Sequence, residues 1–128
     1  MTNRAVICLG SNSPNRAEMI RRAISKVEAE YPSGIAVSHI YETPAIDGVS
    51  PSYSNAVMMF DSPCDYEQTQ LQLKCIEREM GRTAQSKATG IVEIDLDVVM
   101  FNGTVMRPKD FNRNYFQIGY NHIKEHSL

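Results

Sequence analysis

Acidic and apolar residues alternate over residues 91–101, and this pattern restricts the segment to one kind of secondary structure. Successive side chains of a β-strand point to opposite faces, so Glu93, Asp95 and Asp97 are expected to share one face. The sequence therefore predicts a strand with one acidic face and one buried face. The apolar residues between the acids are expected on the buried face: Ile94, Leu96, Val98 and Met100.

The carboxylates on one face of this strand repel each other unless water or a cation separates them, because same-face neighbours lie roughly 7 Å apart. A divalent cation removes the repulsion directly. Mg²⁺ is typically held by one or two carboxylates together with substrate phosphates, so Asp95-Leu96-Asp97 suggests a phosphoryl-transfer site. The alternative is an edge strand whose acidic face is only solvated. The pattern alone leaves both open.

Length and composition limit the classes of protein to consider. The chain has 128 residues, enough for a single domain spanning 1–128 that folds without cross-links. A net charge of −2 gives no general attraction for nucleic acid or membranes, so small-molecule partners are expected. Three cysteines without a Cys-x-x-Cys motif indicate neither a disulfide framework nor a zinc site. With neither a signal sequence nor a membrane span in the pattern, we expect a cytoplasmic monomer.

Three further segments have the composition of strands. Residues 5–9 are continuously apolar and are followed by Gly10, which is typical of a strand buried on both faces. Residues 35–41 are rich in β-branched and aromatic side chains, and residues 53–60 form another run of this kind. In the last of these, odd-numbered residues are expected on one face and even-numbered residues on the other.

Two amphipathic helices are predicted between these strands. Ser13 and Pro14 have the residue types of an N-cap and a first helical position, and the apolar spacing after them favours a helix. Asp65 is the expected N-cap of the second helix, and Gly81 its terminating residue. The order of elements, strand, helix, strand, strand, helix, strand, predicts an α+β, ferredoxin-like βαββαβ fold. Its antiparallel sheet would carry two helices on one face and leave the other face open for a site.

The remaining segments are predicted as loops and a hairpin. Residues 45–52 are rich in turn residues and long enough to form a functional loop, and residues 82–90 form a polar one. Asn102-Gly103 is typical of a type I′ turn, so residues 104–106 are expected to fold back as a C-terminal hairpin arm. Beyond Arg107-Pro108 no period is evident.

Short motifs in this chain occur in an order that is similar to that of one family. The chain resembles the 6-hydroxymethyl-7,8-dihydropterin pyrophosphokinases of the folate pathway over residues 5 to about 106. The resemblance implies transfer of pyrophosphate from ATP to the hydroxymethyl group of the pterin, with release of AMP. The motifs are Gly10-Ser11-Asn12, Tyr41-Glu42-Thr43-Pro44, Tyr53-x-Asn55-Ala56, Glu77 with Gly81-Arg82, and Asp95-Leu96-Asp97.

The same resemblance implies roles for individual residues. Asp95 and Asp97 would bind two Mg²⁺ ions and act in catalysis with Arg82, and Asp95 would help to take the hydroxyl proton. Asn55 would offer a donor and an acceptor to the pterin. The pterin pocket would comprise Thr43, Pro44, Tyr53 and Asn55, with Phe116 or Tyr115 stacking on the ring. The nucleotide would be bound by Glu77, Arg82, Val98 and Arg113.

Departures from the family pattern leave a second function open. The family carries several arginines before the acidic strand, whereas residues 83–90 contain only Lys87 as a cation and Val92 occupies an arginine position. A lysine does not reproduce a bidentate arginine contact with a triphosphate. The alternative is therefore a non-catalytic pterin-binding or regulatory module. Nucleic-acid binding by the open sheet face is disfavoured because that face is acidic. Candidates to replace the arginines are Arg107, Lys109 and Arg113.

Overall fold

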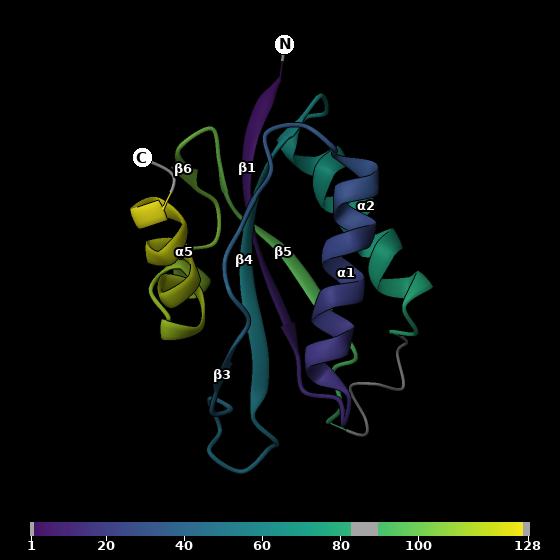
Figure 1. Cartoon of the computed structure of the whole chain (residues 1–128), viewed down its shortest axis with the longest axis vertical. Coiled ribbons are helices and arrows are strands. Elements are labelled where there is room, and N and C mark those ends of the chain that lie inside the picture. Colours follow the sequence, from purple (N-terminus) through teal and green to yellow (C-terminus); the bar gives the residue numbers. More distant parts are fainter. Residues whose placement is uncertain (1, 83–89, 127–128) are drawn as a thin grey trace.

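The computed structural model describes residues 2–82 and 90–126, so most of the loop expected at 82–90, Lys87 included, lies outside the described residues. Strands and helices alternate along the first two thirds of the chain, and two helices close it (Figure 1). The elements are β1 Asn3–Ser11, α1 Arg16–Glu30, β2 Ala36–Val37, β3 Tyr41–Thr43, β4 Tyr53–Ser62, α2 Tyr66–Glu79, β5 Asp95–Phe101, β6 Thr104–Val105, α4 Pro108–Phe111 and α5 Asn114–His126.

One antiparallel sheet forms the centre of the fold. Its strand order is β2-β4-β1-β5-β6, and β3 pairs with β4 beside β2. The central strand β1 pairs with β4 along its whole length, from Asn3 opposite Ser62 to Ser11 opposite Ser54. With β2 and β3 taken as one interrupted strand, this is the order of the predicted ferredoxin-like arrangement. The α+β prediction is confirmed.

The strand predicted over 35–41 is divided into β2 and β3. β2 ends at Val37 and β3 begins at Tyr41. Between them, the Ser38 hydroxyl accepts a hydrogen bond from the backbone N–H of Val57 at 2.9 Å, and the Ser38 N–H donates to the Val57 carbonyl at 2.9 Å. A side chain thus occupies the position of a ladder carbonyl, which ends regular pairing there.

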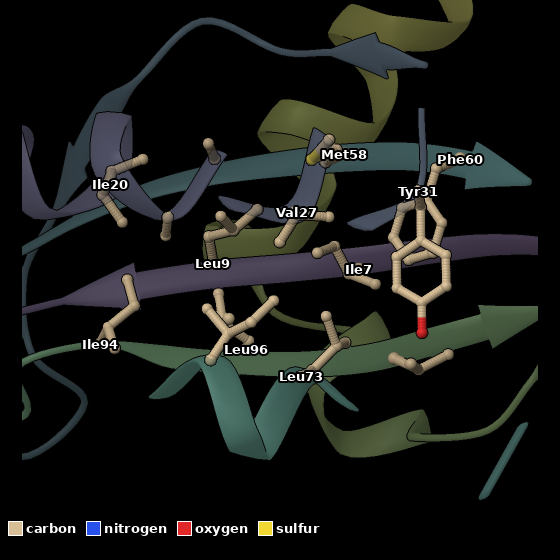
Figure 2. Packing of buried hydrophobic residues seen from close by; sticks show 14 of the residues in the cluster. Ile7, Leu9, Ile20, Val27, Tyr31, Met58, Phe60, Leu73, Ile94 and Leu96 are labelled. Atoms are coloured by element: carbon tan, nitrogen blue, oxygen red, sulfur yellow. The ribbon is translucent and has the colours of Figure 1, made fainter. Parts of the chain in front are cut away.

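The main core lies between the sheet and helices α1 and α2, which cover the same face (Figure 1). Tyr31, just after α1, stacks on Phe60 of β4 with ring centroids 4.5 Å apart. Ala56, Met58 and Phe60 face this core while Val57 faces away, as the alternation predicts. Figure 2 shows the packing of Ile7, Leu9, Ile20, Val27, Met58, Phe60, Leu73, Ile94 and Leu96.

The helix ends confirm the predicted N-cap of α2 and correct the predicted N-cap of α1. Asp65 caps α2 as predicted, since its carboxylate accepts a hydrogen bond from the Gln68 N–H at 2.8 Å. Gly81 follows α2 with φ +100°, a conformation that favours glycine. The N-cap of α1 is Asn15 rather than Ser13, because Pro14 and Asn15 still belong to the preceding turn.

The opposite face of the sheet is partly covered, whereas the prediction left all of it open. Helix α5 packs across it, and Phe116 and Ile123 form a second core with Val6, Cys8 and Val57 (Figure 1). The sequence prediction overlooked α5, although Phe116, Tyr120 and Ile123 recur at spacings of four and three residues and pack together in this core. No helix within residues 2–82 and 90–126 has the length and hydrophobicity needed to cross a membrane.

The acidic strand is shorter than predicted and contains a bulge. β5 begins at Asp95, so Glu93 precedes the strand and does not continue its acidic face. The register with β1 shifts, such that Ile7 pairs with Val98 and Val6 pairs with Met100. Val99 and Met100 consequently lie on the same face, in the α5 core. The prediction that Met100 shares a face with Leu96 is wrong, because a bulge reverses the alternation. Asn102 and Gly103 have φ values of +51° and +80°, as the predicted type I′ hairpin requires.

The surroundings of Gly119 show how closely α5 approaches the sheet. A Cβ at Gly119 would lie 2.7 Å from the Tyr41 hydroxyl oxygen and 2.7 Å from Val57 Cγ2. In an exposed helix, Gly→Ala stabilises by up to about 1 kcal/mol. Here the methyl group must displace buried side chains, so we expect Gly119→Ala to lower the free energy of unfolding by about 1–3 kcal/mol, measured by urea denaturation.

The matched control for this substitution is Asn121→Ala, at an exposed position of the same helix. It should leave the stability unchanged or slightly higher, because only helix propensity changes there. A Gly119→Ala variant as stable as Asn121→Ala would contradict the close packing of α5 on β4.

Candidate functional site

A cavity of about 400 Å³ lies on the α5 face of the sheet, at the end where β1 finishes and β3, β4 and β5 contribute their polar residues. This volume suits a small organic molecule. Six of the predicted site residues line it, together with Gly10 of β1 and Tyr115 of α5. The six are Thr43, Pro44, Tyr53, Asn55, Asp95 and Asp97.

Strand register explains why these residues meet. Gly10 is directly opposite Asn55 of β4 on one side and Asp95 of β5 on the other. Across the sheet at this level lie the amide of Asn55, the backbone of Gly10 without a side chain, and the carboxylate of Asp95. A Cβ at Gly10 would lie 3.7 Å from Asn55 Oδ1 and 3.7 Å from the Tyr53 ring, so the absence of a side chain at Gly10 leaves room in the cavity floor.

Asn55 offers one kind of hydrogen-bonding group to the cavity. Its Nδ2 donates to Thr43 Oγ1 at 2.8 Å and to the carbonyls of Tyr41 and Tyr53 at 3.3 Å each. Both N–H bonds are used within the protein, whereas Oδ1 faces Gly10. In this arrangement Asn55 presents an acceptor to a ligand, rather than the donor and acceptor expected from its residue type.

The aromatic side chain that α5 contributes to the cavity is Tyr115. Phe116, the residue predicted to stack on the pterin, is fully buried between Phe111 and Tyr120, with ring centroids 5.6 Å and 5.2 Å away. Successive helical residues point about 100° apart, so only one of residues 115 and 116 can face the cavity. The Tyr115 hydroxyl donates to Asp110, another residue of the cavity wall.

Cations lie directly against the two aspartates. Arg82 Nη1 donates to Asp95 Oδ1 at 2.7 Å. Lys74 Nζ is 3.1 Å from Asp97 Oδ1 and 3.6 Å from Asp95 Oδ1, so it bridges the pair. Arg107 Nη1 is 3.9 Å from Asp97 Oδ1. The acidic site is thus faced by positive charge from α2 and from the segments that follow α2 and β6.

A polar stripe of α2, consisting of Gln70, Lys74 and Glu77, covers the outer edge of β5. Glu77 Oε2 accepts from the Leu96 N–H at 2.6 Å, and Lys74 Nζ donates to the Leu96 carbonyl at 3.1 Å. Gln70 Oε1 accepts from the Val98 N–H at 2.9 Å. Among the described residues, β6 pairs only with Met100 and Phe101 of β5. The stripe therefore supplies the hydrogen bonds that a neighbouring strand would otherwise make.

The two aspartates differ in their acidity. Burial and the nearby charge of Asp95 raise the pKa of Asp97 to about 6. Burial also opposes ionisation of Asp95, but a hydrogen bond with Asp97 and the charges of Lys74 and Arg82 hold the pKa of Asp95 below its usual value. The pair thus carries one negative charge readily and needs further positive charge to carry two.

The donor set fits Mg²⁺. Asp95 and Asp97 present two hard oxygen ligands on one face, and the raised pKa of Asp97 indicates that their charge is incompletely balanced. Within residues 2–82 and 90–126, no cluster of three or more histidine, cysteine, aspartate or glutamate side chains is arranged to hold a metal. A Mg²⁺ ion at the pair would keep its other positions for water and phosphate oxygens, as this ion commonly does.

Three predicted nucleotide contacts lie elsewhere. The Val98 side chain is fully buried in the α1–α2 core, and Glu77 is only 4% exposed behind β5. Arg113 is exposed between α4 and α5 and does not line the cavity among the described residues. Arg107 is the candidate that reaches the aspartates.

Sequence reasoning missed Lys74. The signal was its spacing from Gln70 and Glu77, four and three residues apart, which places all three on one side of a helix. Such a stripe is typical of a solvated helix face. It contacts the backbone of β5 and the aspartates only because α2 packs against β5. Cys8 of β1 is buried and also borders the cavity, and burial raises the pKa of its thiol.

Comparisons with known proteins point to one family. Residues 6–125 match the family model of 7,8-dihydro-6-hydroxymethylpterin-pyrophosphokinase. The chain is 30% identical over 107 residues to a 2-amino-4-hydroxy-6-hydroxymethyldihydropteridine pyrophosphokinase from Pseudomonas putida, covering 83% of this chain and 88% of that protein. It is 34% identical over 106 residues to the folic acid synthesis protein fol1 of Pneumocystis carinii, covering 81% of this chain and 14% of that longer protein.

Glu77 should contribute strongly to stability although it is charged. Its carboxylate accepts from the Leu96 N–H at 2.6 Å and pairs with Lys74 at 2.8 Å and Arg82 at 3.3 Å. Glu77→Ala leaves the buried Leu96 N–H without its acceptor and removes one partner each from Lys74 and Arg82, so we expect it to lower the free energy of unfolding by about 3 kcal/mol in urea denaturation.

Glu79→Ala is the control for Glu77→Ala. Glu79 is exposed at the end of the same helix and is paired only loosely with Lys26, at 3.5 Å. Its loss should cost less than about 0.5 kcal/mol. Equal effects of the two substitutions would show that Glu77 does not anchor the edge of β5.

Proposed function

This chain belongs to the 7,8-dihydro-6-hydroxymethylpterin-pyrophosphokinase family, and from that premise we propose that Asp95 and Asp97 form its catalytic metal-binding pair. The family transfers pyrophosphate from ATP to 6-hydroxymethyl-7,8-dihydropterin in folate biosynthesis, so the chain is an ATP-dependent diphosphokinase. Nothing in the comparisons favours the alternative of a non-catalytic module.

One observation carries the assignment of the site. A single cavity is lined by Thr43, Pro44, Tyr53 and Asn55 and also by both aspartates. A pterin bound against the first four residues would hold its hydroxymethyl group near the carboxylates. Positioning of this kind accounts for much of the rate enhancement of phosphoryl-transfer enzymes.

The chemistry of the cavity suits a pterin. Asn55 Oδ1 is an acceptor for an N–H group of the heterocycle, and the rings of Tyr53 and Tyr115 provide apolar faces for stacking. Both tyrosines have a raised pKa, chiefly through burial, and so stay neutral. A flat, uncharged heterocycle with several N–H groups matches these contacts.

The reaction forms a bond between the hydroxymethyl oxygen and the β-phosphorus of ATP, and it breaks the bond from that phosphorus to the oxygen that leaves with AMP. Bound Mg²⁺, two ions by the family resemblance, would neutralise the phosphate oxygens. In our proposal Asp95 and Asp97 hold the metal, and Asp95 helps to take the hydroxyl proton. Arg82, a nucleotide-binding residue by the family resemblance, and Arg107, one of the three candidate replacement cations, supply positive charge for the triphosphate. We further propose a cytoplasmic monomer.

The pair is tested by Asp95→Asn. Loss of one carboxylate should weaken metal binding and reduce AMP formation from ATP and the hydroxymethyl pterin by at least about 100-fold. The measurement is chromatographic detection of AMP with Mg²⁺ present. Asp61→Asn is the control, because Asp61 lies opposite Arg4 at the other end of β4. Undiminished AMP formation by Asp95→Asn would refute the assignment.

The pocket is tested by Asn55→Ala. Removing the acceptor should raise KM for the pterin roughly tenfold, while KM for ATP changes little. Steady-state kinetics with each substrate varied in turn measures both constants. A rise in KM for ATP as large as that for the pterin would show that Asn55 does not select the pterin.

A further inference from the structure

The ammonium of Lys74 occupies the position where a bound cation would balance the aspartate pair. Its Nζ lies 3.1 Å from Asp97 Oδ1 and 3.6 Å from Asp95 Oδ1, and the same nitrogen is 2.8 Å from Glu77 Oε2. Burial works against its charge, but these three carboxylates outweigh burial and raise the pKa of Lys74. Lys74 is therefore a charged group shared between the two aspartates.

The local charges nearly balance without a metal. Glu77, Asp95 and Asp97 provide three carboxylates; Lys74 contacts all three, and Arg82 contacts Glu77 and Asp95. Arg107 adds a third positive charge 3.9 Å from Asp97 Oδ1. A divalent cation at the aspartates would add two positive charges to this cluster. At separations of a few ångströms in a partly buried site, like charges repel each other strongly. Metal binding and the present position of Lys74 are thus in competition.

The two cations differ in which carboxylates they contact. Arg82 reaches Asp95, Glu77 and the Ile94 carbonyl through one nitrogen, Nη1. Lys74 is a point charge on a flexible four-carbon chain, one third of its side chain is exposed, and its Nζ lies within 3.6 Å of both aspartates. Lys74 is therefore the cation that a metal ion held by both aspartates would displace.

We propose that Lys74 is an exchangeable counter-cation of the Asp95–Asp97 pair. It balances the pair before metal binds, and it is released when a divalent cation takes its place. The next step rests on the function proposed above. The released ammonium then contacts the phosphates of the nucleotide, which are the nearest new source of negative charge. Val92, in the segment before β5, stands where the family carries an arginine. Lys74 would partly replace that missing cation.

The first test uses Lys74→Gln, which removes the charge but retains a hydrogen-bond donor for Glu77. With Mn²⁺ alone as the probe, measured as free Mn²⁺ by electron paramagnetic resonance, the variant should bind the metal roughly tenfold more tightly than the unmodified protein. With Mg²⁺ and ATP, its KM for ATP should rise roughly tenfold. Damage to the fold would weaken both, so opposite signs identify the counter-cation role. Lys26→Gln on α1, whose partner is the exposed Glu79, should change neither value.

The second test needs no variant. Acylation of lysines by a water-soluble reagent, followed by mass spectrometry, should show Lys74 becoming several-fold more reactive when Mn²⁺ is added, with Lys26 unchanged. Mn²⁺ binding by Lys74→Gln that is no tighter than in the unmodified protein, or Lys74 reactivity that does not rise with Mn²⁺, would overturn the proposal. If both metal-only results hold while the protein forms no AMP, the proposed function fails and the counter-cation role stands.

Discussion

The contact between the polar stripe of α2 and the outer edge of β5 is the constraint on which the site depends. β5 carries both aspartates, yet along most of its outer edge the described structure has no neighbouring strand. Gln70, Lys74 and Glu77 replace that strand with three side-chain hydrogen bonds to the backbone of Leu96 and Val98. Of these three, Lys74 also brings positive charge to the aspartates. One of the groups that hold the strand in place therefore also sets its electrostatics.

The position of the cavity follows from how much of the opposite face α5 covers. Phe116 and Ile123 seal this face over Val6, Cys8 and Val57. The Tyr41 hydroxyl donates to the Tyr115 carbonyl at 2.5 Å and accepts from the Gly119 N–H at 3.0 Å, which joins the helix to the β3 side of the cavity. Beyond this contact the sheet ends in Gly10, Asn55 and Asp95. The cavity is thus bounded by a helix on one side and by strand ends on the other.

The segment before the acidic strand carries fewer arginines than the family pattern, and other segments of the folded chain partly compensate for them. Arg82, Lys74 and Arg107 approach the aspartates from three different segments. A phosphoryl-transfer site needs positive charge close to the phosphates, and any segment of the chain that reaches the site can supply it. A chain can therefore lose cations from one loop and keep a site that is faced by positive charge.

The sequence by itself predicted the fold class and a strand face carrying Asp95 and Asp97, because strand alternation and helical periodicity are local properties of the chain. The family resemblance also implied Thr43, Tyr53 and Asn55, which line the cavity. The sequence prediction overlooked α5, although Phe116, Tyr120 and Ile123 have helical spacing, and it did not reveal the bulge at Val99, which reverses one alternation. Tertiary structure alone decided that Tyr115 rather than Phe116 lines the cavity and that Lys74 bridges the aspartates. Both depend on how a helix is docked against a strand far away in sequence, and no local pattern encodes that geometry.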